Sequence, residues 1–287
     1  MPPPMLPPLS EVIARHALTA RHALGQHFLR DPSLLARIVR AAGPLDGRHV
    51  IEVGPGPGGL TRALLDSAAA SVTVIELDPR AVAAMQELAA WAGPRLHVIA
   101  GDALRLDLPA LVPPPRQIVA NLPYNVATPL LIGWLRQAAA FERMTLMFQQ
   151  EVAERLAAGP DSAAYGRLSV LAQWTCAVAL ELRLPPSAFT PPPKVFSAVV
   201  SLLPHAAQPA PALFATMERL TAAAFGQRRK MLRAALRAGL GAETAARLLA
   251  ATGIDPTRRA ETLSVAEFDR MARELGSYAA GTCISPR

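Results

Sequence analysis

The residues Asn121-Leu122-Pro123-Tyr124 follow the apolar run 117–120 and so stand where a predicted buried strand ends. At the carboxyl edge of a parallel sheet, an amide, a proline-fixed backbone and an aromatic ring can converge on one flat ligand. A planar base with an exocyclic amine suits this set, because the Asn121 oxygen and a backbone carbonyl near Pro123 can accept its amino protons while Tyr124 covers its face. The alternative is a strand that ends in a turn, with Tyr124 as ordinary packing.

A glycine-rich turn follows an earlier apolar run, 49–53. Gly54, Gly56 and Gly59 match G-x-G-x-x-G, and Glu76 ends the next predicted strand about twenty residues on, where a ribose-binding acid is expected. The pattern predicts a nucleoside-binding site but leaves the nucleoside open. A nicotinamide cofactor places its pyrophosphate at the helix N-terminus, whereas S-adenosylmethionine places an amino acid and a sulfonium there. A tight strand-to-helix turn without a ligand is the structural alternative.

Two features favour the methyl donor. Asp102 ends the third predicted strand, where its carboxylate can accept a hydrogen bond from an adenine amino group, and the fourth strand ends in the group 121–124. Taken alone, Asp102 is more often a helix cap. Because the ends of neighbouring parallel strands lie along one edge of the sheet, we expect Glu76, Asp102 and Asn121 to share one crevice.

The elements that must position these residues alternate between strand and helix. The predicted strands are 49–53, 71–77, 96–100, 117–122, 144–148, 177–184 and 195–203, and the predicted helices before residue 176 are 11–20, 32–42, 60–69, 79–91, 128–138 and 165–175. This alternation indicates an α/β fold with a mostly parallel seven-stranded sheet covered on both faces. We expect a tail and short helix in 1–20, a catalytic domain in 21–204 and a small all-helical domain in 205–287.

Composition narrows the class of protein. The 287 residues are 51% hydrophobic, enough for one sizeable domain and a small one, and this excludes wholesale disorder. Two cysteines are too few for a disulfide framework or a cysteine zinc site, and the six histidines show no metal-ligand spacing, so we expect no metal. Prolines interrupt the uncharged stretch 195–217, and the proline-rich segment 1–8 lacks the features of a secretory signal. We therefore expect a cytoplasmic protein without a membrane segment.

The net charge of +7 is concentrated near the C-terminus, where residues 205–287 carry 12 basic against 7 acidic side chains. Basic residues with four-residue spacing face away from leucines at 232, 236 and 240 on one predicted helix. Because arginine pairs bidentately with phosphate, these residues are candidate RNA contacts, and a solvated helix face is the alternative. The set comprises Arg228, Arg229, Lys230, Arg233 and Arg237.

Several short stretches together resemble the bacterial small-subunit (16S) ribosomal RNA adenine N6,N6-dimethyltransferases, a family of class I S-adenosylmethionine-dependent methyltransferases with a Rossmann-like fold. The resemblance runs from Gly25 to about Lys230 and leaves out the tail 1–8 and the segment after Tyr278. The stretches that carry it are 25–29, 52–61, 75–78, 101–103, 121–125, 149–155, 165–169, 187–195 and 225–230.

The resemblance implies a role for each matching donor-site residue. His27 and Leu29 would contact S-adenosylmethionine from the amino-terminal segment, and Gly54 would lie against its methionine part. Gly56, from the glycine motif, is a further candidate donor contact. Glu76 would hold the ribose hydroxyls, Asp102 the donor adenine, and Asn121 both donor and target. The family commonly has asparagine where this chain has His27, so a backbone contact is the one that would survive the change.

The resemblance also implies how the target base is held. Asn121, Leu122, Pro123 and Tyr124 would form the catalytic group, with the Asn121 side chain and the Leu122 carbonyl turning the amine towards tetrahedral geometry for in-line transfer. Phe189, in a proline-rich segment, would face Tyr124 across the base. The alternative for Phe189 is a loop anchor packed on the sheet.

The implied activity is dimethylation of two adjacent adenosines in a hairpin loop near the 3′ end of 16S ribosomal RNA, during biogenesis of the small subunit. A monomer without an obligate protein partner is the simplest expectation. The segments 187–195 and 225–230 favour this activity over that of the related large-subunit (23S) adenine methyltransferases of the antibiotic-resistance type. A nicotinamide oxidoreductase and a non-catalytic RNA-binding assembly factor remain as alternatives from other classes.

Overall fold

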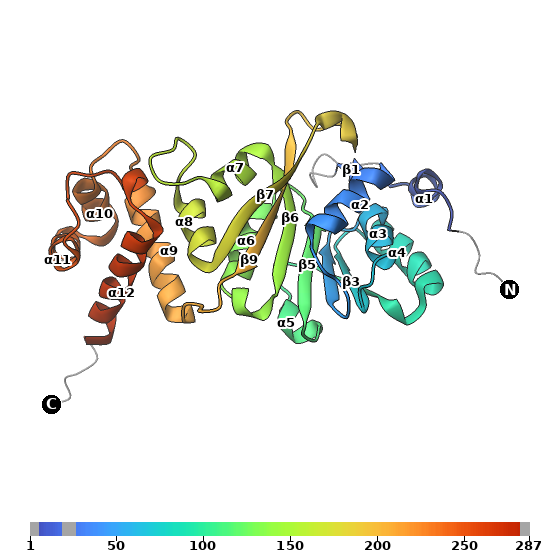
Figure 1. The fold of residues 1–287 in the computed structure, drawn as a ribbon, viewed down its shortest axis with the longest axis horizontal. Helices are drawn as coiled ribbons and strands as arrows, with labels where there is room; N and C mark the ends of the chain where they lie inside the picture. The colour runs from blue at the N-terminus through green and yellow to red at the C-terminus, as the bar shows by residue number, and fades with distance from the viewer. Residues whose placement is uncertain (1–5, 19–26, 282–287) are drawn as a thin grey trace. The chain divides into compact units, whose positions relative to one another are not determined.

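The computed structural model describes residues 6–18 and 27–281, and the chain forms two compact units (Figure 1). The first unit contains the residues up to Ala153 together with Ala179–Pro204, and the second contains Glu154–Val178 with the residues from His205 onward. Residues 1–5, 19–26 and 282–287 lie outside the described part. The first of these ranges belongs to the predicted tail.

A seven-stranded sheet forms the centre of the first unit (Figure 1). The strand order is β4-β3-β2-β5-β6-β9-β7. The pairs among β2 to β6 are parallel, whereas β9 runs antiparallel to β6. The strands are β2 His49–Val53, β3 Ser71–Glu76, β4 Leu96–Ala100, β5 Arg116–Asn121, β6 Arg143–Gln149, β7 Cys176–Leu184 and β9 Ser197–Pro204. Each lies within one or two residues of its prediction, and the mostly parallel sheet is confirmed.

Helices follow the parallel strands, as expected for strand-to-helix crossovers. They are α2 Pro32–Ala41, α3 Gly59–Leu65, α4 Pro79–Ala92, α5 Leu108–Leu111, α6 Ala127–Leu135 and α7 Gln150–Ala157. Local chemistry sets the starts of two of them: the Asp31 carboxylate caps α2, the Asp78 carboxylate caps α4, and each cap precedes a proline at the first helical position. Apolar side chains of α2, α3 and α4 pack with β2 and β3 into one core. Helix α7 was not predicted.

The predicted N-terminal helix ends earlier than expected. Helix α1 spans Leu9–Arg15, and Ala17 adopts a left-handed conformation with φ of 49° while the Leu18 N–H donates to the Ile13 carbonyl. Such a left-handed residue with a back-bonded N–H terminates helices.

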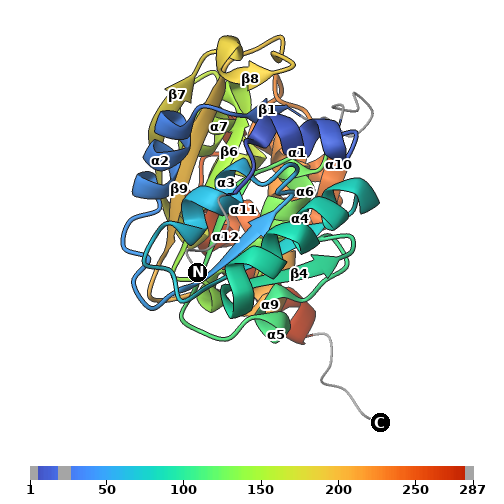
Figure 2. The same ribbon diagram turned by 90° about the vertical axis from the view of Figure 1, so that its right-hand side faces the viewer.

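A second, two-stranded sheet joins residues that are far apart in the sequence. β1 (Phe28–Leu29) pairs antiparallel with β8 (Phe189–Thr190), in the register Phe28 to Thr190 and Leu29 to Phe189. Figure 2 shows the two short strands side by side. The sequence did not predict this pairing. The pairing brings the segment that begins at His27 next to the proline-rich segment 185–193.

The second unit is helical apart from the start of β7, as the sequence predicts for its C-terminal part. Its helices are α8 Arg167–Thr175, α9 Pro211–Phe225, α10 Leu232–Leu240, α11 Ala242–Thr252 and α12 Val265–Gly281. The expected boundary at residue 204 coincides with a boundary between the two units, but Glu154–Val178, which contains α8 and was expected in the catalytic domain, belongs with these helices. Helix α8 packs on α9 and α12, and the Trp174 indole N–H donates to Asp269 on α12.

Candidate active site

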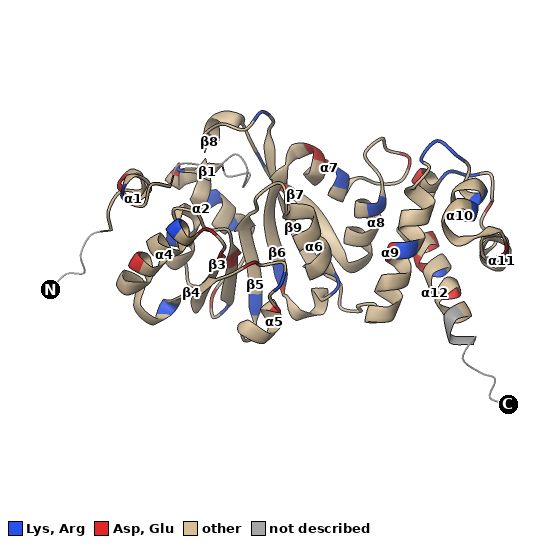
Figure 3. Cartoon of the chain, turned by 180° about the vertical axis from the view of Figure 1, so that it is seen from behind, with Lys and Arg blue, Asp and Glu red and all other residues tan. Residues whose placement is uncertain are grey.

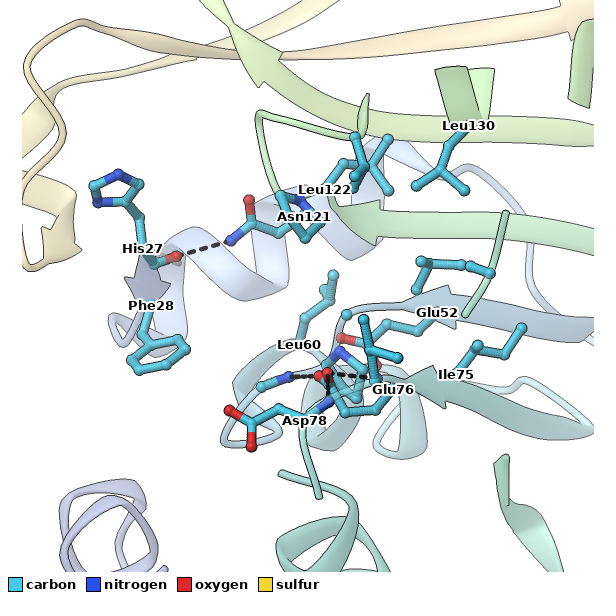
Figure 4. Close-up of a pocket in the computed structure, with 18 of the residues that line it drawn as sticks. His27, Phe28, Glu52, Leu60, Ile75, Glu76, Asp78, Asn121, Leu122 and Leu130 are labelled. Carbon is cyan, nitrogen blue, oxygen red and sulfur yellow. Dashed lines mark hydrogen bonds between the residues drawn. The ribbon is translucent and has the colours of Figure 1, made fainter. Parts of the chain in front are cut away.

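One cavity of the first unit lies at the carboxyl ends of β2, β3, β4 and β5. It is lined by the turns that follow these strands and by the segment around β1 (Figure 4). Every residue with a predicted donor contact lines it, together with the catalytic group: His27, Leu29, Gly54, Gly56, Glu76, Asp102, Asn121, Leu122, Pro123 and Tyr124. The crevice expected from the strand ends is therefore present.

The Glu76 carboxylate is held in place by three backbone N–H groups, drawn as dashed lines in Figure 4. Its Oε1 accepts from Leu77 at 2.8 Å and from Asp78 at 2.9 Å, and its Oε2 accepts from Gly56 at 3.3 Å. Each carboxylate oxygen offers two lone pairs, so Oε2 retains one for a ligand hydroxyl. Burial raises the pKa of Glu76, against the lowering effect of these N–H donors.

Two glycines bring the backbone close to the cavity. Gly54 has φ of 72°, and a Cβ there would lie 3.4 Å from the Pro123 ring. Gly56 has φ of 54°, and a Cβ there would lie 3.0 Å from the Phe28 ring. Both backbones occupy a region that favours glycine, so the turn after β2 can approach the turn after β5 and the β1 segment.

Glu52 is a cavity residue that the sequence did not single out for a role. Its side chain lies next to the glycine turn and is 1% exposed, and the Thr61 hydroxyl donates to its Oε2 at 2.6 Å. Burial raises the pKa of Glu52 to about 8, and the neighbouring Glu76 charge adds to the rise. The signal available in the sequence was an acid inside the apolar run of β2, where a buried carboxyl demands an explanation.

Asp102 lines the cavity from the turn that follows β4. Its Oδ1 accepts from the Leu104 N–H at 3.0 Å, and its Oδ2 lies 3.6 Å from Arg105 Nε. It therefore shapes the turn after β4 as well as lining the cavity. Leu77 and Leu104 also line the cavity although they are 61% and 47% exposed. Large exposed apolar side chains at a crevice are suited to contact with a flat ring. Neither residue was predicted from the sequence to contact a ligand.

Asn121, at the end of β5, is oriented by the residue before β1. Its Nδ2 donates to the backbone carbonyl of His27 at 3.1 Å. A carbonyl only accepts, so this bond identifies the nitrogen and assigns the other carboxamide atom as Oδ1. Figure 4 shows Oδ1 directed away from the end of the cavity that holds Glu76. The Pro123 carbonyl accepts from Val126 at 3.1 Å, which favours the Leu122 carbonyl as the backbone acceptor for a target amine.

Tyr124 is half-buried at the same end of the cavity. Its hydroxyl is 2.6 Å from the hydroxyl of the buried Ser197 at the start of β9. Burial raises the pKa of Tyr124, so the phenol stays protonated at neutral pH. The ring of His27 lies beside the Tyr124 ring, with centroids 5.5 Å apart and planes inclined by 31°.

Phe189 does not occupy the place predicted for it. Its side chain is 3% exposed and belongs to the apolar core, and it is not among the residues that line the cavity. The pairing of β8 with β1 turns it inward opposite Leu29. The structure therefore matches the alternative interpretation, a loop anchor, and corrects the expectation that Phe189 faces Tyr124.

The basic residues predicted to contact RNA do not share one helix. Helix α10 begins at Leu232, so Arg229 and Lys230 lie in the exposed turn before it. Arg233 and Arg237 are exposed on α10, whose Leu232 and Leu236 are buried as predicted. Figure 3 shows the blue basic residues along this turn and helix.

Arg228 differs from its neighbours because it is used within the second unit. Its guanidinium donates to the backbone carbonyls of Ala163 and Tyr165 and lies 3.2 Å from Glu261. The turn before α10 is thereby tied to η5 (Ala260–Thr262) and to the segment before α8. This contact set indicates a structural role for Arg228.

Residues 6–18 and 27–281 contain neither a metal-binding cluster nor a membrane-spanning helix. No group of three or more His, Cys, Asp or Glu side chains in these ranges is arranged to bind a metal ion. Within the same ranges, no helix combines the length and apolar character needed to span a bilayer.

Comparisons with known proteins agree on one family. A family model described as ribosomal RNA adenine dimethylase matches residues 17–276. The ribosomal RNA small subunit methyltransferase A of Gluconobacter oxydans is 61% identical over 93% of this chain and 87% of its own length, and that of Paramagnetospirillum magneticum is 58% identical over 94% and 95%. Among solved structures, a dimethyladenosine transferase from Plasmodium falciparum is 26% identical with a TM-score of 0.75, covering 88% of this chain and 98% of its own. The 23S ribosomal RNA methyltransferase ErmE is 26% identical with a TM-score of 0.63, covering 86% and 99%.

Proposed function

Because the chain belongs to the ribosomal RNA adenine dimethylase family, we propose that it dimethylates N6 of two adjacent adenosines in a hairpin loop near the 3′ end of 16S ribosomal RNA, during small-subunit biogenesis. The methyl donor is S-adenosylmethionine, as in class I enzymes of this fold. The observation that carries the proposal is one cavity lined at one end by Glu76 and Asp102 and at the other by Asn121 and Tyr124.

The donor end of the cavity fits S-adenosylmethionine. Glu76 Oε2 keeps a lone pair for a ribose hydroxyl, and the exposed faces of Leu77 and Leu104 suit the adenine ring. Asp102, which lines the same cavity, can accept from the adenine amino group. Gly54 and Gly56 line the cavity and place the turn after β2 against the Pro123 and Phe28 rings with no side chain between them. When bound, the cofactor would supply a methyl group on a positively charged sulfonium.

The target end fits an exocyclic amine. The N6 lone pair of adenine is delocalised into the ring, so the amine is a poor nucleophile until acceptors draw its protons out of the ring plane. Asn121 Oδ1 and the Leu122 carbonyl can accept both protons, while the Tyr124 ring, fixed by Ser197, stacks on the base. The nitrogen lone pair would then form the new N–C bond while the carbon–sulfur bond of the sulfonium breaks and its electron pair stays on sulfur, and one proton would leave to water. The methylated amine keeps one proton for a second round.

Sequence-independent attraction to RNA is assigned to the second unit. Arg229, Lys230, Arg233 and Arg237 are exposed and can contact phosphates. We also propose that the protein acts as a monomer in the cytoplasm, without a metal and without an obligate protein partner.

The alternatives are less well supported. The chain is 55% to 61% identical to several small-subunit methyltransferases but 26% identical to the 23S enzyme. A nicotinamide oxidoreductase would share the glycine turn and Glu76, yet the cavity also holds Asn121 and the Leu122 carbonyl, which suit an amine. A non-catalytic assembly factor would not require amine acceptors in the cavity.

Incubation with methyl-labelled donor and each purified, unmethylated ribosomal subunit tests the proposal. Label is expected in small-subunit RNA alone, and digestion should release it as N6,N6-dimethyladenosine. Label confined to the large subunit would establish the 23S alternative. If neither subunit takes up label while NADH binds tightly in a parallel titration, the oxidoreductase interpretation replaces the proposal.

A further inference from the structure

The first turn of α4 carries an ion pair between Arg80 and Asp78, neither of which was predicted to have a role. The pair is bidentate: Arg80 Nε donates to Asp78 Oδ1 at 3.0 Å, and Nη2 donates to Oδ2 at 2.6 Å. The Asp78 side chain is 1% exposed and that of Arg80 is 23% exposed. Because burial of a carboxylate is costly without a partner, Arg80 supplies a counter-charge that helps Asp78 to remain buried.

Asp78 belongs to the donor end of the cavity, where Figure 4 shows it next to Glu76. Its backbone N–H donates to Glu76 Oε1 at 2.9 Å, and it directly follows Leu77, whose exposed side chain also lines the cavity. The Asp78 carboxylate in turn caps α4 by accepting from the Arg80 N–H at 3.1 Å. The position of Asp78 therefore sets the path of the turn that carries both the candidate ribose acceptor and an apolar surface for adenine.

The third nitrogen of the Arg80 guanidinium reaches the N-terminal helix. Its Nη1 donates at 2.6 Å to the backbone carbonyl of Ala17, the left-handed residue that follows α1. A second contact set holds α1 on α4, because the side chains of Arg15 and His16 both bond to Glu87. All three guanidinium nitrogens are thus engaged in hydrogen bonds. The rigid fork of the side chain fixes the end of α1 and the turn after β3 relative to each other.

We propose that Arg80 is a positioning residue for the methyl donor, an inference that rests on the proposed function. Arg80 does not line the cavity, so it acts through Asp78 and not by touching the donor. By holding the turn after β3 against the end of α1, it keeps Glu76 and Leu77 in the geometry that receives the adenosine part of S-adenosylmethionine. Loss of Arg80 loosens this turn and leaves the groups at the target end unchanged.

A contribution to stability alone is the competing explanation. In that case the loss of Arg80 would lower the unfolding temperature, and the folded protein would bind the donor as before. Two substitutions at this position and one elsewhere separate the two roles. Arg80→Gln removes the charge, and Arg80→Lys keeps it. Arg95→Gln is the matched control, because Arg95 also donates to two backbone carbonyls, those of Ser67 and Ala69, and does not line the cavity.

The experiment measures the Kd of S-adenosylmethionine and of 5′-methylthioadenosine by calorimetric titration, together with the unfolding temperature, the donor KM and kcat on unmethylated small subunits. We expect Arg80→Gln to raise both Kd values and the donor KM by about 10-fold, while kcat at saturating donor stays within about twofold of wild type. 5′-Methylthioadenosine lacks the amino acid part, so an equal loss for both ligands places the effect at the adenosine part. Arg80→Lys should recover about half of the loss on a logarithmic scale, and Arg95→Gln should bind the donor as wild type does.

Three results would overturn the inference. One is a wild-type donor Kd in Arg80→Gln, whatever its unfolding temperature, since this assigns Arg80 to stability alone. Another is a loss confined to kcat or to S-adenosylmethionine, which would place the effect outside the adenosine part. The third is an Arg80→Lys variant that binds no better than Arg80→Gln, which would exclude the charge beside Asp78 as the positioning contact. In each case a wild-type protein that binds the donor and methylates small subunits leaves the proposed function standing, whereas a wild type that does neither refutes the function itself.

Discussion

The carboxamide of Asn121 is oriented by the backbone carbonyl of His27, which accepts its Nδ2–H at 3.1 Å. This contact joins the end of β5 to the segment that precedes β1, 94 residues away in the sequence. It decides which carboxamide atom is available for catalysis. The oxygen is left to accept from a target amine, and the bond uses only the backbone of His27, so it does not depend on the residue type at that position.

Replacement of Asn121 by alanine should abolish catalysis while leaving much of the donor site intact. The change removes a preorganised acceptor at the reacting nitrogen, for which a loss of about 100-fold or more in the transfer rate is expected. Donor binding should weaken by far less, because Glu76 and Asp102 remain. Single-turnover methylation and a donor titration measure the two effects. Gln137→Ala, which removes an exposed carboxamide just after α6 that does not line the cavity, is the comparison variant, and equal rates in both variants would contradict the assignment.

Tyr124→Ala should cost much more activity than Tyr124→Phe. Alanine removes the stacking surface, worth about 1 to 3 kcal/mol, whereas phenylalanine removes only the hydrogen bond to Ser197. The buried Ser197 hydroxyl then lacks that partner, so a modest loss of stability is expected in Tyr124→Phe. Measured kcat/KM values for RNA decide the matter, since similar losses in both variants would mean that the hydroxyl, and not the ring, is needed.

The sheet and the donor site were predictable because their signals are local. Short apolar runs, a glycine turn and acids at strand ends suffice to place Gly54, Glu76 and Asp102 along one edge of a parallel sheet. The target end was only half predictable. Asn121 and Tyr124 follow a strand, whereas the ring beside Tyr124 depends on the β1–β8 pairing, which joins segments about 160 residues apart and consists of two residues a strand.

The helical C-terminal region shows a different limit. Four-residue spacing correctly predicts that Leu232 and Leu236 are buried and that Arg233 and Arg237 are exposed. Periodicity alone does not reveal that the helix starts only at Leu232, after an exposed turn. Nor does it show that the Arg228 guanidinium donates hydrogen bonds to backbone carbonyls of a segment about 65 residues earlier.

Glu52 should make the first unit less stable as the pH rises. Its pKa is raised from 4.5 to about 8 in the folded state, so folding favours the protonated form. Its stabilising contribution is complete below about pH 4.5, declines as the pH rises and is lost above about pH 8. Glu52→Gln mimics the neutral acid and should be more stable than wild type by a few kcal/mol above about pH 8, with the difference shrinking towards pH 4.5.

Urea unfolding at several pH values measures this difference. The Thr61 hydroxyl can still donate to the amide oxygen of the glutamine variant, so the hydrogen bond is preserved. Some pH dependence should remain in Glu52→Gln, because burial also raises the pKa of Glu76. A variant that is no more stable than wild type at high pH would show that Glu52 is ionised in the folded protein.

Arg233 and Arg237 should contribute to RNA affinity, and Arg228 to stability. For the double substitution of Arg233 and Arg237 by glutamine, RNA affinity should fall and the slope of log affinity against log salt should become shallower by about 0.7 to 0.9 for each lost phosphate contact. Arg228→Gln should instead lower the unfolding temperature, because two carbonyls and Glu261 lose their partner. The reverse pattern would contradict the placement of these side chains.

Mapping the methylated nucleotides after reaction with unmethylated small subunits tests the central claim most directly. Digestion and mass spectrometry of the RNA give the position and the number of methyl groups at each adenosine. The account predicts two adjacent N6,N6-dimethyladenosines in a hairpin loop near the 3′ end and no other modified base. Methyl groups on another atom of adenine, on another base or at scattered positions would contradict it.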